Sequence, residues 1–140
     1  RLHRVALAWT REARRIDADR SDLALLEAKL TLVMDRPDLA LAGVQETARR
    51  GGSAELWAFA GAVHAENGDD EKAADAYERA LAIDPQPSGW WLAFAIAAER
   101  TQRPTEARDA YRRALRRGLD EPQRRFAVAR LNTLLRRDLP

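Results

Sequence analysis

The sequence contains no cysteine and only two histidines, His3 and His64. The absence of cysteine excludes a disulfide framework, a thiolate nucleophile and a sulfur-ligated metal site. His64 has no second metal ligand at a suitable spacing, so we expect it to pack in the core. The chain also lacks a glycine-rich phosphate loop, a nucleophile elbow and a carboxylate pair with an evident cleft. We therefore expect no metal, no cofactor and no catalytic residues.

Long hydrophobic runs are missing as well. No stretch approaches the roughly 20 uncharged apolar residues that span a bilayer, and no charged-then-apolar leader opens the sequence. The 140 residues are 46% hydrophobic and 33% charged, which is typical of one globular domain and too apolar for a disordered chain. We expect a soluble piece of a larger protein.

Lysine is almost absent, because Lys29 and Lys72 are the only two among 24 basic residues. Residues 1–100 have a net charge of −4 and residues 101–140 a net charge of +6, mostly from arginine pairs such as Arg112-Arg113 and Arg124-Arg125. This basic end could contact phosphates, so a nucleic-acid-associated or regulatory module is an alternative. Interspersed carboxylates and the lack of interleaved aromatic residues favour a solvated surface instead. Nucleic acid is therefore not the expected partner.

A repeat with a period of 34 residues runs through the middle of the chain. A shift of 34 aligns two sets of small and aromatic residues: Trp57, Gly61, Ala73, Tyr77 and Ala80 with Trp91, Ala95, Ala107, Tyr111 and Ala114. The small residues allow helix axes to approach closely, and the aromatic residues fill the wider gaps. With Gly68-Asp69 and Pro85, residues 54–87 resemble a tetratricopeptide repeat.

This resemblance implies an all-α fold, a right-handed superhelix of antiparallel helix pairs with about eight helices. The same phase divides the single domain into residues 1–19, the second helix of a truncated repeat; 20–53, a degenerate repeat; 54–87 and 88–119, two repeats; and 120–140, a C-terminal capping helix. We expect helices near 2–16, 21–34, 37–49, 54–67, 70–83, 88–101, 104–117 and 121–137. Apolar surface is expected at the amino end, around Val5 and Trp9.

In this family the first helix of each pair lines a concave groove that holds peptides or helices. The inward positions carried over from the family, with their flanking residues, predict a partner-binding groove of Leu25, Lys29, Ala58, Ala62, Leu92, Ile96, Glu99, Phe126 and Arg130. The mostly apolar lining suits an amphipathic helix or an extended apolar segment. In the alternative reading, Leu92, Ile96 and Phe126 pack against a last helix that closes the groove.

Related repeats that clamp chaperone carboxylates have lysine and asparagine at these inward positions. This chain has Lys29, but the other positions are Ala58, Ala62, Leu92 and Ile96, so the clamp is absent. Chaperone tails are therefore not expected partners. A narrower resemblance, to the C-terminal repeats of bacterial MSHA-type pilus biogenesis proteins, rests on residues 77–81, 84–87, 90–92, 111–115 and 126–135. It implies a non-catalytic protein-binding scaffold in the assembly of bacterial envelope or pilus machinery. The protein would then be envelope-associated on the periplasmic side, or cytoplasmic, and its oligomeric state stays open.

Overall fold

A computed structural model describes residues 1–51 and 53–139, and within these ranges the chain forms eight α-helices and no strand. The helices are α1 (Leu2–Ile16), α2 (Ser21–Val33), α3 (Pro37–Arg49), α4 (Ala54–Glu66), α5 (Asp70–Ile83), α6 (Ser88–Arg100), α7 (Pro104–Arg117) and α8 (Glu121–Arg137). The all-α fold is confirmed, and each helix agrees with its expected range to within one residue. Gly52, beside which the repeat loses one residue, and Pro140 lie outside the described residues.

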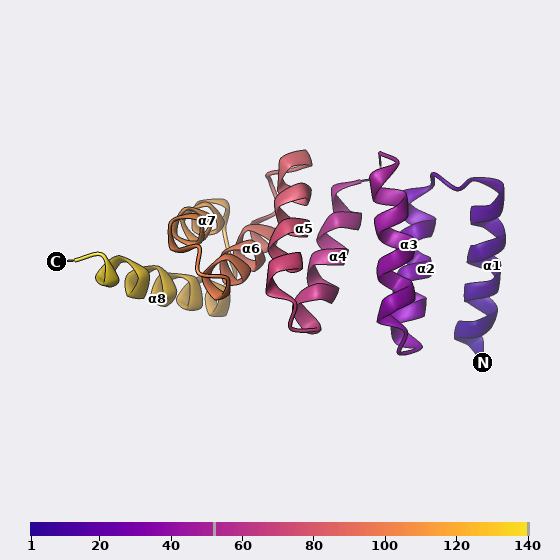
Figure 1. Cartoon of the computed structure of the whole chain (residues 1–140), viewed down its shortest axis with the longest axis horizontal. Helices are drawn as coiled ribbons and strands as arrows, with labels where there is room; N and C mark the ends of the chain where they lie inside the picture. The colour runs from indigo at the N-terminus through magenta and orange to yellow at the C-terminus, as the bar shows by residue number, and fades with distance from the viewer. Residues whose placement is uncertain (52, 140) are drawn as a thin grey trace.

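The helices stand side by side in a row, with the two termini at opposite ends (Figure 1). Each helix packs against the next, and α4·α5 and α6·α7 make the most extensive contacts. The helices form the pairs α2/α3, α4/α5 and α6/α7. The first helices of these pairs also contact one another, because α2 touches α4 and α4 touches α6. The orientation of the helices changes along the row, so that α8 lies nearly across the direction of α1 (Figure 1). This stacking is that of a helical solenoid.

The small residues of the repeat lie where helices cross. Ala73, Ala80, Ala107 and Ala114 have no exposed surface, and Tyr111 is also completely buried. A Cβ atom added at Gly61 would lie 2.8 Å from the ring of Tyr77, which is closer than side-chain packing allows. The close crossing of α4 and α5 therefore requires glycine at this position.

Each first helix ends at the same point of the repeat, with one residue in the left-handed conformation. These residues are Asp35, Gly68 and Gln102, with φ values of 58°, 77° and 61°. The next residue closes the turn in each case: the amides of Arg36, Asp69 and Arg103 donate to the carbonyls of Thr31, His64 and Ala98 at 3.1, 2.9 and 2.8 Å. Pro37 and Pro104 then begin α3 and α7. The conformation of the turn is thus the same in the three repeats, although the residue at its left-handed position differs.

The amino end exposes apolar surface as expected. Val5 is 52% exposed and Trp9 is 77% exposed on α1, whereas Leu7 on the opposite side is buried against the solenoid. No described helix is long and apolar enough to cross a membrane.

Candidate functional site

The predicted groove residues differ in how much surface they present. Lys29 and Ala62 are exposed, Leu25 and Ile96 are half-buried, and Ala58 and Leu92 are only 7% exposed. Leu92 and Ala58 therefore belong to the hydrophobic core, where they support the wall and offer little surface to a ligand. Substitution of Leu92 by a charged residue would test folding and not binding.

A hollow in the wall of first helices lies between α2 and α4. Its volume is about 390 Å³, and it is lined by Leu32, Phe59, Ala62, Val63, Glu66 and Asn67. Residues 59, 62, 63 and 66 follow the i, i+3, i+4, i+7 spacing of one helix face. The sequence prediction did not include Phe59, because it used only two inward positions per helix. The spacing of this face could have identified it. The hollow is mostly apolar and has one carboxylate, that of Glu66, at its edge.

At the carboxyl end, three predicted groove residues, Glu99, Phe126 and Arg130, take part in contacts around Tyr111. The ring of Phe126 meets that of Tyr111 edge-on, with centroids 6.4 Å apart, although Phe126 remains 43% exposed. The Tyr111 hydroxyl donates to Glu99 at 2.8 Å, and Arg130 forms an ion pair with the same carboxylate. These contacts join α6, α7 and α8. Glu99 and Arg130 therefore neutralise each other's charge.

The network determines the ionisation of Glu99. Burial opposes the charged form, but the hydrogen bonds from Arg130 and Tyr111 and the positive charge of Arg130 outweigh it, so the pKa of Glu99 lies below its ordinary value of 4.5. Burial, together with the hydrogen bond to Glu99 and the nearby charge of its carboxylate, raises the pKa of Tyr111. Tyr111 is therefore a donor throughout the physiological range.

We expect Glu99→Gln to destabilise the protein by about 1 kcal/mol at neutral pH and to weaken its acid dependence. Because the folded-state pKa of Glu99 is lowered, the ionised carboxylate stabilises the fold above pH 4.5, and this stability is lost as pH falls through the folded-state pKa. Urea unfolding at about pH 7 and about pH 3 checks this. Glu66→Gln, on the exposed end of α4, is the control, and equal acid dependence in both variants would contradict the prediction.

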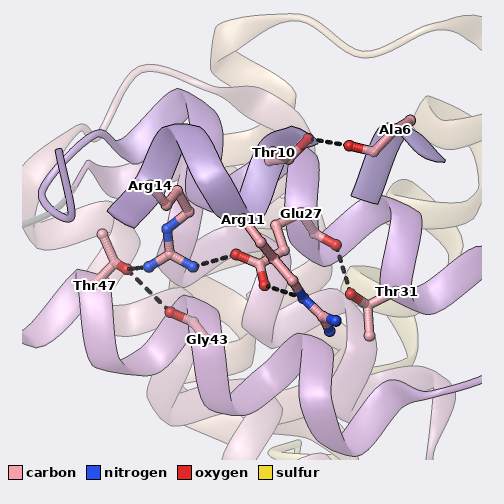
Figure 2. Close-up of polar contacts among 8 residues, drawn as sticks. All are labelled: Ala6, Thr10, Arg11, Arg14, Glu27, Thr31, Gly43 and Thr47. Atoms are coloured by element: carbon pink, nitrogen blue, oxygen red, sulfur yellow. Dashed lines mark hydrogen bonds and ion pairs between the residues drawn. The ribbon is translucent and has the colours of Figure 1, made fainter. Parts of the chain in front are cut away.

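A second polar network joins α1, α2 and α3 (Figure 2). Arg14 donates to Glu27 at 2.5 Å and to the Thr47 hydroxyl at 2.7 Å, and Arg11 donates to Glu27 at 3.2 Å. The side chains of Arg14 and Glu27 are 17% and 19% exposed. The Nε atom of Arg14 is buried without a hydrogen-bond partner. This network connects the first described helix to the following repeat and is structural.

The basic end and His64 complete the candidate sites. Several arginines of α7 and α8 pair with carboxylates, such as Arg113 with Asp109 at 2.8 Å and Arg125 with Glu121 at 3.0 Å. Nucleic-acid binding by this end remains the alternative that the sequence does not favour. His64 is 8% exposed and packs in the core as expected. Within residues 1–51 and 53–139, no group of three or more acidic or imidazole side chains could hold a metal ion.

Comparisons with known proteins agree with this architecture. Models of the tetratricopeptide repeat match residues 54–87 and 91–138, together more than half of the chain. No curated protein sequence matches it. Among solved structures, the MamA protein has a TM-score of 0.75 at 16% identity, with 92% of this chain and 69% of that chain covered.

Two further structures show the same fold. YrrB, described as a TPR protein with an unusual peptide-binding site, has a TM-score of 0.77 at 15% identity and covers 94% of this chain and 67% of its own. The Arabidopsis OM64 TPR domain has a TM-score of 0.68 at 22% identity, with 85% and 96% covered. Proteins built from these repeats are generally non-catalytic scaffolds for protein–protein interaction. The repeat models, the eight helices and their stacking together show that this chain belongs to the tetratricopeptide-repeat family.

Proposed function

We propose that this protein binds a peptide or helix of a partner protein on its wall of first helices, at the hollow between α2 and α4. The observation that carries the proposal is the apolar lining of that hollow, where Leu32, Phe59, Ala62 and Val63 leave a volume of about 390 Å³ open to a ligand. Leu32 is 38% exposed and Ala62 is also exposed, so apolar surface is available for burial. Burial of a partner's apolar side chain there would supply most of the affinity.

The charges around the hollow indicate which partner fits. Glu66 lines one edge, and the exposed Lys29 lies on α2 one turn before Leu32. A partner helix with an apolar face flanked by one basic and one acidic residue would complement both. Toward the carboxyl end, the predicted groove offers less surface to a ligand at Leu92, which is buried, and Glu99 is paired with Arg130.

We expect Ala62→Arg to reduce the affinity for such peptides at least about tenfold while the protein stays folded. The arginine would fill the hollow and place a charge against the partner's apolar face, and the exposed Ala62 can accept it without disturbing the core. Peptides selected on the wild-type protein from a random display library serve as probes. Their binding is measured by calorimetry, and their location by amide shifts of residues 59–66 in NMR spectra.

Ala42→Arg is the matched control, because it adds the same charge at an exposed alanine of the second helix α3. Full affinity in the Ala62→Arg variant would refute the hollow as the binding site. Loss of folding in that variant would instead show that Ala62 supports the core and that the inner wall is assigned to the wrong helix face.

For the cellular role, we propose assembly of bacterial envelope or pilus machinery, on the periplasmic side or in the cytoplasm. This rests on the sequence resemblance to MSHA-type pilus biogenesis proteins. Fractionation of cells that express the parent protein tests it. Co-purification with envelope or pilus assembly proteins, from the envelope or the cytoplasmic fraction, would support the role, and recovery without these proteins from both fractions would refute it.

A further inference from the structure

A smaller cavity lies on the side of the second helices, between α3, α4 and α5. Its volume is about 150 Å³, and its lining is largely polar: Gln45, Arg49, Trp57, His64, Lys72, Asp75, Ala76 and Arg79. Trp57, His64 and Ala76 are buried and form the floor, whereas the charged residues are exposed and form the rim. A cavity of this size is below the range of about 300–1,000 Å³ for drug-sized ligands, so it suits a small group.

Two arginines at the rim, Arg49 and Arg79, have no ion-pair partner within residues 1–51 and 53–139. The guanidinium of Arg79 lies over the Trp57 ring, with Cζ 4.7 Å from the centroid, which leaves its N–H donors available in its own plane. The one carboxylate of the lining, that of Asp75, faces Arg103 at 3.8 Å. The cavity therefore has a net positive charge.

The floor supplies further polar groups. The amide nitrogen of Gln45 lies 3.2 Å from Nε2 of His64 and can donate to it when the imidazole is neutral. Burial lowers the pKa of His64; the negative charge of Asp69 opposes this, and the positive charge of Lys72 adds to it. Lys72 itself is paired with Asp69 at 3.2 Å, so the two arginines are the cations free for a ligand.

The next repeat contains an equivalent cavity with the opposite charge. It lies between α5, α6 and α7, has a volume of about 290 Å³ and is lined by Glu78, Leu81, Ala82, Trp91, Phe94, Glu106 and Asp109. Gln45, Arg49 and Lys72 correspond in the repeat to Glu78, Ala82 and Glu106, while the tryptophan is present in both. The repeat itself thus creates a hollow beside the tryptophan. The positive lining is specific to the first of these two cavities.

We propose that the cavity between α3, α4 and α5 binds a phosphate group, held by the guanidiniums of Arg49 and Arg79 with Gln45 and His64 at its base. Arginine forms paired, charge-assisted hydrogen bonds with phosphate oxygens, and two arginines match the double negative charge of a phosphate monoester. The group could belong to free phosphate or to a phosphate ester, and the same contacts serve both. This site is independent of the hollow between α2 and α4.

The ring signals of His64 provide the test, since His3 is the only other histidine and lies on α1. Inorganic phosphate and O-phosphoserine are added in separate NMR titrations, with sodium chloride at matched ionic strength as the blank. We expect a saturable shift of the His64 signals, no shift of the His3 signals and a higher pKa of His64 when phosphate is bound, because the anion favours the imidazolium. Tighter binding of O-phosphoserine would identify an ester as the ligand, and tighter binding of inorganic phosphate would identify the free ion.

Arg49→Gln and Arg79→Gln should each weaken phosphate binding at least about tenfold. Arg113→Gln is the matched control. Arg113 corresponds to Arg79 in the repeat and stacks on Trp91 at 4.8 Å, but it pairs with Asp109 beside the acidic cavity. Equal weakening in all three variants would show only a general charge effect and would overturn the proposal. A His64 response that does not saturate, or that chloride reproduces, would overturn it as well.

Discussion

Replacing Trp57 by alanine is expected to destabilise the protein by about 3–5 kcal/mol. The indole is 9% exposed and lies in the core cluster between α3, α4 and α5, under the guanidinium of Arg79. Its removal leaves a cavity at the contact between two repeats, which the rigid helix pairs cannot close. Urea unfolding followed by circular dichroism measures the loss. Because repeats unfold in part independently, the transition should also become broader.

Trp9→Ala is the matched control for this prediction. It deletes the same side chain from α1, where the indole is 77% exposed, and we expect a change within about 0.5 kcal/mol. The difference between the two variants therefore measures burial and not the chemistry of tryptophan. Comparable losses in both would show that the exposed face of α1 is covered in solution.

We expect Glu27→Ala to destabilise the protein by about 2–3 kcal/mol. The substitution leaves the guanidinium of Arg14 between three helices without its carboxylate, and only the hydroxyl of Thr47 remains as an acceptor (Figure 2). Breaking a fully buried ion pair costs about 3–5 kcal/mol, and the partial exposure of this pair reduces the figure. Thermal or urea unfolding measures the effect.

The double variant Arg14→Leu/Glu27→Ala separates the cost of an unpaired charge from the value of the pair. The repeat places Ala48, Leu81 and Leu115 at the position of Arg14, and Ala60 and Phe94 at that of Glu27, so both substitutions restore the apolar pattern. We expect the double variant to regain most of the lost stability. A double variant that is less stable than Glu27→Ala would show that the pair itself stabilises the fold.

The order of the helices and their ends could be predicted from the sequence, because the same residue types recur at the same positions of successive repeats. A glycine or alanine at a helix crossing, an aromatic residue in the adjacent gap and a proline after the turn are local requirements of helix pairing. Gly61 shows this directly, since a Cβ atom there would meet the ring of Tyr77. The turn was predictable at Gly68 and harder to see at Asp35 and Gln102, where ordinary residues adopt the same left-handed conformation.

The candidate sites depended more on tertiary structure. The sequence identified Ala62 as an inward residue, but its neighbour across the hollow, Leu32, comes from another repeat, and the burial of Leu92 depends on how its helix turns against α5 and α7. The sequence by itself determined the repeat, and hence the fold, because helix pairing is a local property. Only the tertiary structure decided which charged residues pair. Glu99 pairs with Arg130, 31 residues away in the sequence. Arg49 of α3 and Arg79 of α5 line one cavity. Such pairings depend on the distances between helices, and these distances cannot be derived from the sequence alone.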